Sequence, residues 1–224
     1  MFHGTPPLWA MVRPKPLWQS LYDLVGAPLR MVLLPDHINE HFHLTSLRAE
    51  RLAAVLGEIE GQLLDIGAGD NMLVRLYQPA SIGDVDAQRS VGLDVFDWGG
   101  GCVIVEDCRK LPFDDATFDT VSFVACLNHI PERRDALREA YRVLRPGGKL
   151  IVTMIGKLIG AVGHAIWWYS EDKHREVRAD ELPGIDSSDV VSLIHGAGFM
   201  DIKTNSFVYG LNTLYTARRL DESR

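Results

Sequence analysis

The chain is poor in cysteine. Its 224 residues include only Cys102, Cys108 and Cys126, and none of them stands in a CxxC motif or at Cys/His zinc spacing. An odd number of cysteines without such spacing indicates neither a disulfide framework nor a structural metal site. We therefore expect reduced thiols, no bound metal and a cytoplasmic protein.

Positive charge is also scarce. Lysine and arginine total 23 residues against 30 for aspartate and glutamate, which gives a net charge of -7. General binding to nucleic acid needs a basic surface that neutralises phosphates. The composition therefore predicts no nucleic-acid partner and favours a small or neutral substrate.

A leader segment and an unbroken apolar run are both missing. The first 18 residues contain prolines and no basic segment followed by an apolar stretch of signal-peptide length, so we expect a flexible arm there. The apolar run at residues 150–170 is interrupted by Lys157 and His164 and begins with β-rich residues. A buried strand followed by an apolar helix explains it better than a transmembrane helix.

What the chain does contain, from residue 61 onward, is an alternation of short apolar runs with helical patterns. This alternation is typical of an α/β protein in which helices cover both faces of a parallel sheet. A helix is expected from Pro131, ended by the RPGG segment, and a hairpin turning at residues 209–212 predicts an antiparallel last strand. Residues 1–60 form a separate N-terminal part with one clear helix. The expected strands of the main sheet before the hairpin are residues 63–66, 91–95, 102–106, 118–126 and 149–154.

The stretch LLDIGAGDN, residues 63–71, is the first candidate for ligand binding. Gly67 and Gly69 allow an unusual turn and let a ligand lie directly against the backbone. A dinucleotide fingerprint would need a third glycine where Met72 stands, and the charge of Asp70 would repel a pyrophosphate. The loop therefore favours a ligand that is not anionic at this point, such as a cationic adenosine derivative.

Acids follow three successive strands. Asp94 closes the second strand, where a carboxylate can accept both hydroxyls of a ribose, and Asp107 follows the third, where it can accept the exocyclic amine of adenine. Asp65 lies under the glycine loop, where it can orient amides or meet an ammonium group. Each acid alone would more often be a helix cap, a turn residue or a solvated loop residue. Together they indicate a nucleoside-binding edge.

These segments resemble a known family. In order and spacing, LLDIGAGDN, VGLDV, EDCRKLPFDDATFDTV and YRVLRPGGKLIV are similar to the motifs of class I S-adenosylmethionine-dependent methyltransferases. LPFDDATFD and RVLRPGGKL look especially like the branch that methylates quinones, sterols and other small molecules. The resemblance implies a three-layer, Rossmann-like sheet of seven mostly parallel strands with an antiparallel last strand. It also implies lid helices within residues 1–60 and a methyltransferase domain over residues 61–224.

The resemblance implies roles for individual residues. Asp65, Gly67 and Gly69 would hold the methionine end of S-adenosylmethionine, Asp94 its ribose, and Asp107 its adenine, with the backbone of Cys108 nearby. The family usually has a third glycine where Asn71 stands, and an asparagine tolerates the strained backbone that this glycine adopts. Cys108 and Cys126 are otherwise expected to be small buried hydrophobic residues. The remaining residues that we expect to line the cofactor site are Ala68, Val95 and Ala125.

Methyl transfer needs alignment and, for some acceptors, a base that removes a proton. The candidates are His129, which follows the fourth strand, and His37 and His41, which lie one helical turn apart in the expected lid. His37, His41 and His43 are also spaced like metal ligands, but polar decoration of a surface helix is the simpler explanation. His129 is as easily a packing residue, and Asn128 is a plausible polar contact beside it.

The apolar insertion around residues 155–185 has three explanations. It forms a helix buried against the sheet, or the wall of an apolar substrate pocket with Trp167, Trp168 and Tyr169 and a polar handle at His164 or His174. Alternatively, together with residues 17–35, it forms a surface that touches lipid.

We conclude from the sequence that the protein methylates a small molecule by direct displacement from S-adenosylmethionine, with an apolar acceptor as one option. The alternatives are a regulatory protein that keeps the cofactor pocket, a protein or RNA methyltransferase, and, less favoured, a nicotinamide-dependent reductase. Enzymes acting on adenine N6, cytosine N4 or glutamine carry an Asn/Asp-Pro-Pro-Tyr/Phe segment after the fourth strand. This chain has Leu127, Asn128, His129 and Ile130 there, which weighs against such targets. The sequence predicts no particular oligomeric state.

Overall fold

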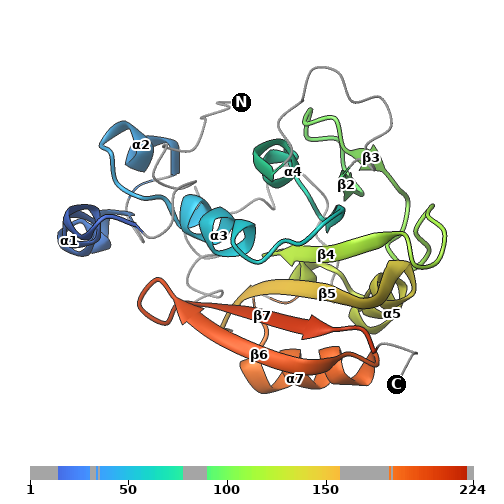
Figure 1. Cartoon of the computed structure of the whole chain (residues 1–224). Coiled ribbons are helices and arrows are strands. Elements are labelled where there is room, and N and C mark those ends of the chain that lie inside the picture. The colour runs from blue at the N-terminus through green and yellow to red at the C-terminus, as the bar shows by residue number, and fades with distance from the viewer. Residues whose placement is uncertain are drawn as a thin grey trace.

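The computed structural model describes residues 15–30, 34, 36–77, 90–156, 182 and 184–220 of the chain, without the side chains of residues 36, 37 and 40. Its centre is a seven-stranded sheet in the order β3-β2-β1-β4-β5-β7-β6 (Figure 1). β7 runs antiparallel to both of its neighbours, and the other strand pairs are parallel. The expected seven-stranded, mostly parallel sheet is therefore confirmed. Its strands are β1 (Leu63–Ile66), β2 (Val91–Asp94), β3 (Val103–Ile104), β4 (Phe118–Val124), β5 (Leu144–Ile155), β6 (Met200–Phe207) and β7 (Asn212–Arg218).

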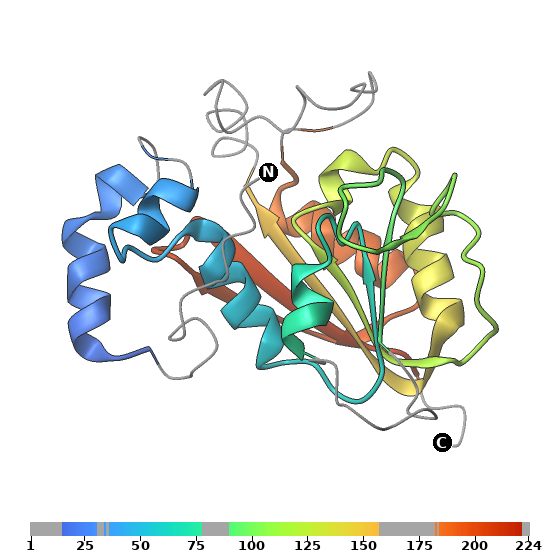
Figure 2. The same ribbon diagram turned by 90° about the horizontal axis from the view of Figure 1, so that it is seen from above.

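Helices cover both faces of this sheet, as Figure 2 shows from above. α3 (Leu47–Leu56) and α4 (Met72–Tyr77) bury side chains on one face, while α5 (Arg133–Val143) and α7 (Ser187–Gly196) bury theirs on the other. Successive strand residues point to opposite faces, so Ile151 packs in the α3/α4 core and its neighbours Leu150 and Val152 pack in the α5/α7 core. This alternation produces the three layers expected from the sequence.

Several strand and helix ends differ from the sequence prediction. β2 ends at Asp94, and β3, at one edge of the sheet, consists of only two residues. β4 stops at Val124 because Ala125 has a φ of 54°, which leaves the extended region. The helix expected from Pro131 begins at Arg133, and the RPGG segment lies inside β5 instead of preceding it.

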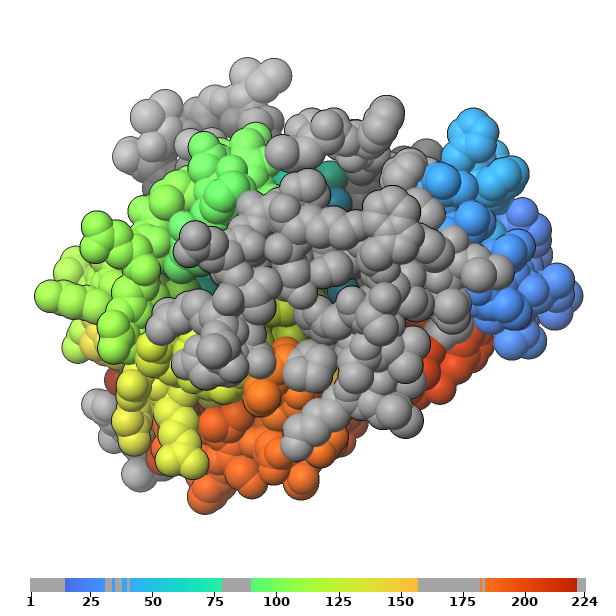
Figure 3. All heavy atoms as spheres, turned by 180° about the vertical axis from the view of Figure 1, so that it is seen from behind, coloured from blue at the N-terminus to red at the C-terminus, as the bar shows by residue number. Residues whose placement is uncertain are grey.

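The N-terminal part contains more helix than expected. Besides α3, it forms α1 (Leu17–Val25) and α2 (Asp36–His41), and these two lie at one margin of the molecule, seen in blue in Figure 3. The arm before residue 15 and most of the insertion at residues 155–185, including Trp167, Trp168, Tyr169, His164 and His174, lie outside the described residues. Among the helices that are described, none combines the length and apolar composition needed to cross a bilayer.

Candidate functional site

The loop after β1 is tied to β2 by backbone hydrogen bonds. The amides of Gly67 and Ala68 both donate to the carbonyl of Leu93, at 2.8 and 3.0 Å. Gly67, Gly69 and Asn71 have φ values of 71°, 57° and 63°, in the left-handed region that glycine favours. Asn71 therefore adopts the backbone conformation expected of the glycine that it replaces.

The two glycines serve different purposes. A Cβ atom added to Gly67 would lie 2.7 Å from Cβ of Cys126, whose thiol donates to the carbonyl of Ile66 at 3.0 Å. A Cβ atom added to Gly69 would have no neighbour within 4 Å. Gly67 is thus required by close packing inside the loop, whereas Gly69 faces open space against which a ligand can lie.

Asp94 joins the end of β2 to the glycine loop. Its Oδ2 accepts the amide of Gly69 at 2.9 Å, and its Oδ1 accepts the amide of Phe96 at 3.0 Å. The residue is 8% exposed. Each carboxylate oxygen has a second lone pair, so Asp94 can still accept hydrogen bonds from two neighbouring hydroxyls. This geometry fits a ribose beside Gly69.

Asp65 is buried beneath the same loop. Its Oδ1 accepts a hydrogen bond from Oγ of Ser122, on β4, at 2.6 Å. Burial raises the pKa of Asp65 to about 7, the hydrogen bond from Ser122 opposes this, and the charge of Asp94 adds to it. A cation bound at the loop would favour the ionised form, so Asp65 is matched electrostatically to a positively charged ligand.

The negative charge of Asp70 is balanced by nearby arginines that the sequence did not suggest. Arg48 of α3 forms an ion pair with its carboxylate, and Nη2 of Arg75 lies 3.9 Å away. Burial alone would raise the pKa of Asp70, but the hydrogen bond and charge of Arg48 outweigh burial and hold the pKa below its usual value. The argument that Asp70 repels an anionic ligand is therefore weakened, and any such repulsion rests on Asp65 and Asp94.

The remaining expected cofactor residues lie around these acids. Asp107 is half-buried, and its carboxylate accepts the amide of Arg109 at 2.7 Å and Nε of Arg109 at 2.5 Å. Cys108 is buried in the α5/α7 core, and burial raises the pKa of its thiol to about 11, as expected of an unreactive hydrophobic residue. Val95 follows Asp94 and is 57% exposed, so it offers an apolar surface next to the proposed ribose position.

The candidate bases occupy different environments. His129 ends the short 3-10 helix η3 (Leu127–His129), and its Nε2 lies 3.1 Å from Nδ2 of Asn128. The same amide nitrogen donates to the carbonyl of Leu182 at 3.0 Å. His41 is exposed on α2, and the side chain of His37 lies outside the described residues. No group of three potential metal ligands occurs in the part of the chain that the structure describes.

Three contributors to this site were missed in the sequence. Ser122 hydrogen bonds to Asp65, and its only signal was a hydroxyl in the middle of a buried strand. Arg48 comes from a helix 22 residues before its partner Asp70, and no sequence pattern marked that pairing. Gly100 packs on Asp70 so closely that an added Cβ would lie 2.3 Å from its backbone, which explains the glycine at this position.

Comparison with known proteins identifies the same segment. Residues 64–152 match a methyltransferase domain family. A ubiquinone/menaquinone biosynthesis C-methyltransferase of Desulfotalea psychrophila is 26% identical over 185 residues, which cover 67% of this chain and 70% of the relative. A sterol 4-C-methyltransferase of Caenorhabditis elegans is 34% identical over 152 residues, covering 67% of this chain and 40% of the relative. The chain spans about half the length of several other relatives from quinone biosynthesis.

Solved structures share the fold. An S-adenosylmethionine-dependent methyltransferase from Thermotoga maritima has a TM-score of 0.55 at 18% identity, covering 89% of this chain and 95% of that one. The [4+2]-cyclase SpnF also has a TM-score of 0.55, at 19% identity, covering 91% and 95%. The matched domain, the seven-stranded sheet and the glycine loop with its acids agree with one another. Residues 64–152 thus match a methyltransferase domain, and the described residues share the fold of S-adenosylmethionine-dependent methyltransferases.

Proposed function

We propose that the protein transfers a methyl group from S-adenosylmethionine to a small apolar acceptor and releases S-adenosylhomocysteine. The main support is the open space over Gly69, bordered by Asp94 and by the left-handed backbone of Gly67 and Asn71. When bound there, S-adenosylmethionine would supply an activated methyl group, so that the protein needs to align the acceptor and exclude water.

In this proposal the backbone of residues 67–71 holds the methionine end of the cofactor. Asp94 accepts the ribose hydroxyls, and Val95 covers one face of the adenine. Asp107 and the backbone of Cys108 lie near the adenine edge, and Ala125 lines the site at the end of β4. The carboxylate of Asp107 is partly used by Arg109, so its role requires that it also accept a hydrogen bond from the adenine amine.

The acceptor is proposed to be apolar because of the names of two relatives. One acts in ubiquinone and menaquinone biosynthesis and the other is a sterol 4-C-methyltransferase, so both names point to lipid substrates. A small acceptor also agrees with the net charge of -7, which disfavours nucleic acid. The three cysteines are free thiols, which suits a reducing compartment such as the cytoplasm.

His129 is proposed to position the end of β4 instead of acting as the base. Nδ2 of Asn128 has two hydrogens, and its contacts with Leu182 and His129 use both of them. Nε2 of His129 is then a hydrogen-bond acceptor, and its lone pair is already engaged. Methyl transfer should therefore survive His129→Gln, in which the side-chain oxygen replaces that acceptor. His37 and His41 of α2 remain the candidate bases.

A cofactor-binding protein with a different reaction is the second candidate. It is favoured by one observation, the similarity of the fold to the [4+2]-cyclase SpnF. The two candidates differ in whether S-adenosylmethionine is consumed, so turnover of the cofactor separates them.

The test is calorimetric titration of the full chain with S-adenosylmethionine, S-adenosylhomocysteine and NADH. We expect binding of both adenosyl compounds and none of NADH, and loss of about tenfold or more in affinity for Asp94→Ala, because the ribose loses its acceptor. Asp97→Ala is the control, since Asp97 follows the same strand but accepts the exposed amide of Gly99. Equal affinity for wild type and Asp94→Ala would remove the ribose role. Radiolabelled methyl transfer to quinol and sterol acceptors then tests the reaction.

A further inference from the structure

α1 is an amphipathic helix whose polar side faces inward. Its two buried residues are Gln19 and Asp23, both 0% exposed and one helical turn apart. Since an α-helix turns about 100° per residue, Leu21 lies on the opposite side. Ser20 and six apolar side chains of α1 are exposed. The apolar ones, which form its outer face, are exposed by 44–89% and are Leu17, Trp18, Leu21, Tyr22, Leu24 and Val25. This is the reverse of the usual arrangement, in which the apolar side of a surface helix faces the core.

Hydrogen bonds and ion pairs hold the inward side in place. Oδ1 of Asp23 accepts the amide of Thr45 at 2.9 Å and Nε2 of Gln19 at 3.0 Å, and Nζ of Lys15 lies 2.6 Å from Oδ2. Lys15 also pairs with Glu50 of α3 at 2.5 Å. Burial opposes ionisation of Asp23, but the hydrogen bonds from Lys15 and Thr45 outweigh it and hold its pKa below the usual value.

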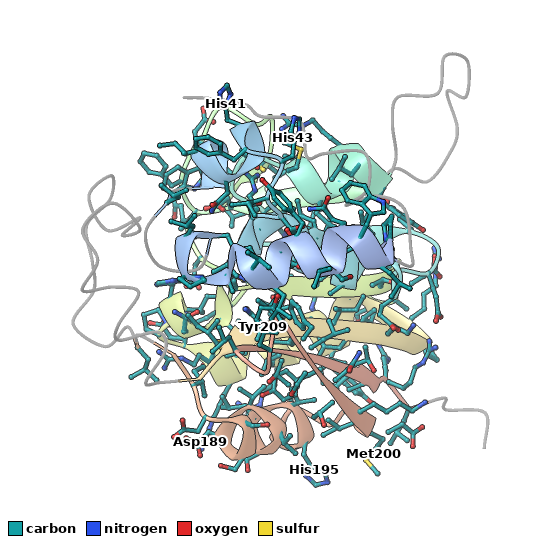
Figure 4. All side chains as sticks on the ribbon, turned by 90° about the vertical axis from the view of Figure 1, so that its left-hand side faces the viewer. His41, His43, Asp189, His195, Met200 and Tyr209 are labelled. Carbon is teal, nitrogen blue, oxygen red and sulfur yellow. The ribbon has the colours of Figure 1, made fainter. Side chains whose placement is uncertain are left out.

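Arg30 extends this network to the sheet. Its guanidinium is buried and donates to the carbonyls of Asp23 and Thr45 at 3.1 and 2.8 Å and to Glu50 at 3.2 Å. It also donates to the hydroxyl of Tyr209 at 3.2 Å and lies 5.4 Å from the centre of that ring. Tyr209 is at the tip of the β6–β7 hairpin, and Figure 4 shows it directly beside α1.

The hairpin tip fixes where α1 lies relative to the cofactor site. Ile155, at the carboxyl end of β5, pairs with Asn212 at the start of β7, so the tip lies at the carboxyl edge of the sheet. The glycine loop and Asp94 leave strands at that same edge. α1 is therefore attached to the edge at which the reaction is proposed to occur.

Turning α1 to bury its leucines would break this network. It would remove Asp23 from Lys15 and Thr45 and take Gln19 from the carbonyl of His43. It would also take the carbonyl of Asp23 from the buried guanidinium of Arg30. These hydrogen bonds hold the apolar side of α1 outward.

We propose that the outer face of α1 docks on a lipid surface and that the protein collects its acceptor there. A second copy of the chain is the weaker occupant, because a nine-residue helix is about 14 Å long and about 10 Å wide. Such a patch falls well below the roughly 800 Å² per partner of a stable interface. A lipid surface has no such threshold, since each inserted side chain adds its own transfer free energy.

The composition of the face supports the same occupant. Asp23 is the single charged residue of α1, and it points inward, so nothing charged has to enter the lipid. Trp18 and Tyr22 lie at the sides of the leucines, and the hydroxyl of Tyr22 bonds to the carbonyl of Phe42, itself 54% exposed. Aromatic residues beside leucine are typical of interfacial helices. The absence of lysine and arginine predicts binding to neutral lipid.

The inference rests on the proposed function only in its account of why the protein docks on lipid. The test of docking does not measure activity. The full chain is sedimented with phosphatidylcholine vesicles, with and without phosphatidylglycerol. We expect wild type to bind both alike, and Leu21→Ser to lower the partition coefficient by about tenfold or more. Met200→Ser is the matched control, because Met200 is 42% exposed and lies at the lower edge of the molecule in Figure 4, away from α1. Each variant is first checked for unchanged circular dichroism and S-adenosylhomocysteine affinity.

Three outcomes would overturn the inference. They are absence of binding by wild type, equal binding by Leu21→Ser, and binding that appears only with phosphatidylglycerol. A dimer in sedimentation velocity that Leu21→Ser dissociates, without vesicle binding, would assign the face to a second copy instead. Failure of S-adenosylhomocysteine to bind, with vesicle binding intact, would count against the proposed function and leave the docking surface standing.

Discussion

At the scale of single residues, we expect Gly67 to matter mainly for stability and Gly69 mainly for cofactor binding. Both have positive φ, so alanine at either position costs about 1 kcal/mol of backbone strain. Only at Gly67 does the new Cβ also meet Cys126, which adds a packing cost of about 1–3 kcal/mol. We therefore expect Gly67→Ala to lower the melting temperature by more than Gly69→Ala does.

The reverse order is expected for cofactor affinity. At Gly69 the Cβ occupies the open space in which the ligand is proposed to lie, so Gly69→Ala should remove S-adenosylhomocysteine binding from a protein that still melts cooperatively. Calorimetry and thermal unfolding of the two variants check this together. Normal affinity in Gly69→Ala would place the ligand elsewhere.

Asp65 predicts a pH dependence of both stability and binding. Its pKa in the free protein is about 7 against 3.8 for the ordinary group, so the folded state binds this proton more tightly than the unfolded state. Its contribution to stability is full below pH 3.8 and is lost as the pH rises through 7. Asp65→Asn, which stays neutral, should accordingly raise the melting temperature relative to wild type by most at pH 8 and by clearly less at pH 5, because the loss in wild type grows between pH 3.8 and pH 7.

Cofactor binding should follow pH in the opposite direction. A cationic ligand favours ionised Asp65, so its binding releases a proton near pH 7, and affinity for S-adenosylmethionine should rise between about pH 6 and pH 8. Titrations in buffers of different ionisation enthalpy measure that proton. If Asp65→Asn releases as many protons as wild type, the proton comes from another group.

At the scale of elements, the junction between α1, α3 and the β6–β7 hairpin depends on Arg30. The residue is 1% exposed, and its removal would leave the carbonyls of Asp23 and Thr45 without a donor. Arg30→Ala should therefore reduce the free energy of unfolding by about 3–5 kcal/mol in urea titrations. Arg138→Ala, on the exposed side of α5, should change it by less than about 0.5 kcal/mol. Similar losses in both variants would contradict a buried network at this junction.

The same junction shows where sequence reasoning fell short. For residues 17–35 the sequence suggested lipid contact, as one of three explanations of the apolar insertion. Periodicity could not tell which side of α1 faces outward, because that depends on Lys15, Thr45, Glu50 and Tyr209 from four other segments. Strand ends were misplaced for a related reason. β4 ends where Ala125 changes its backbone conformation beside Thr153, whose carbonyl and hydroxyl both accept the amide of Ala125. Tertiary partners of this kind leave no local pattern.

At the scale of the whole molecule, the sheet and the methyltransferase domain were predictable because they rest on repeated local signals. Short apolar runs with alternating helices define the parallel sheet, and Leu63 to Asn71 carries the binding loop within one continuous segment. Asp65 and Asp94 could be placed together, since parallel strands end at one edge. The pairing of Arg48 with Asp70 was not predictable, because it joins the N-terminal part to this loop across the surface.

The two proposals combine in a prediction about where the acceptor is found. An apolar quinol or sterol dissolved in phosphatidylcholine vesicles should be methylated by wild type, because α1 brings the carboxyl edge of the sheet to the lipid. Leu21→Ser should lose about tenfold or more of this rate through weaker docking, yet methylate a short-chain, water-soluble analogue at the wild-type rate. Met200→Ser should match wild type with both acceptors. If Leu21→Ser loses activity equally on the soluble analogue, Leu21 acts on the site itself and docking does not explain its position.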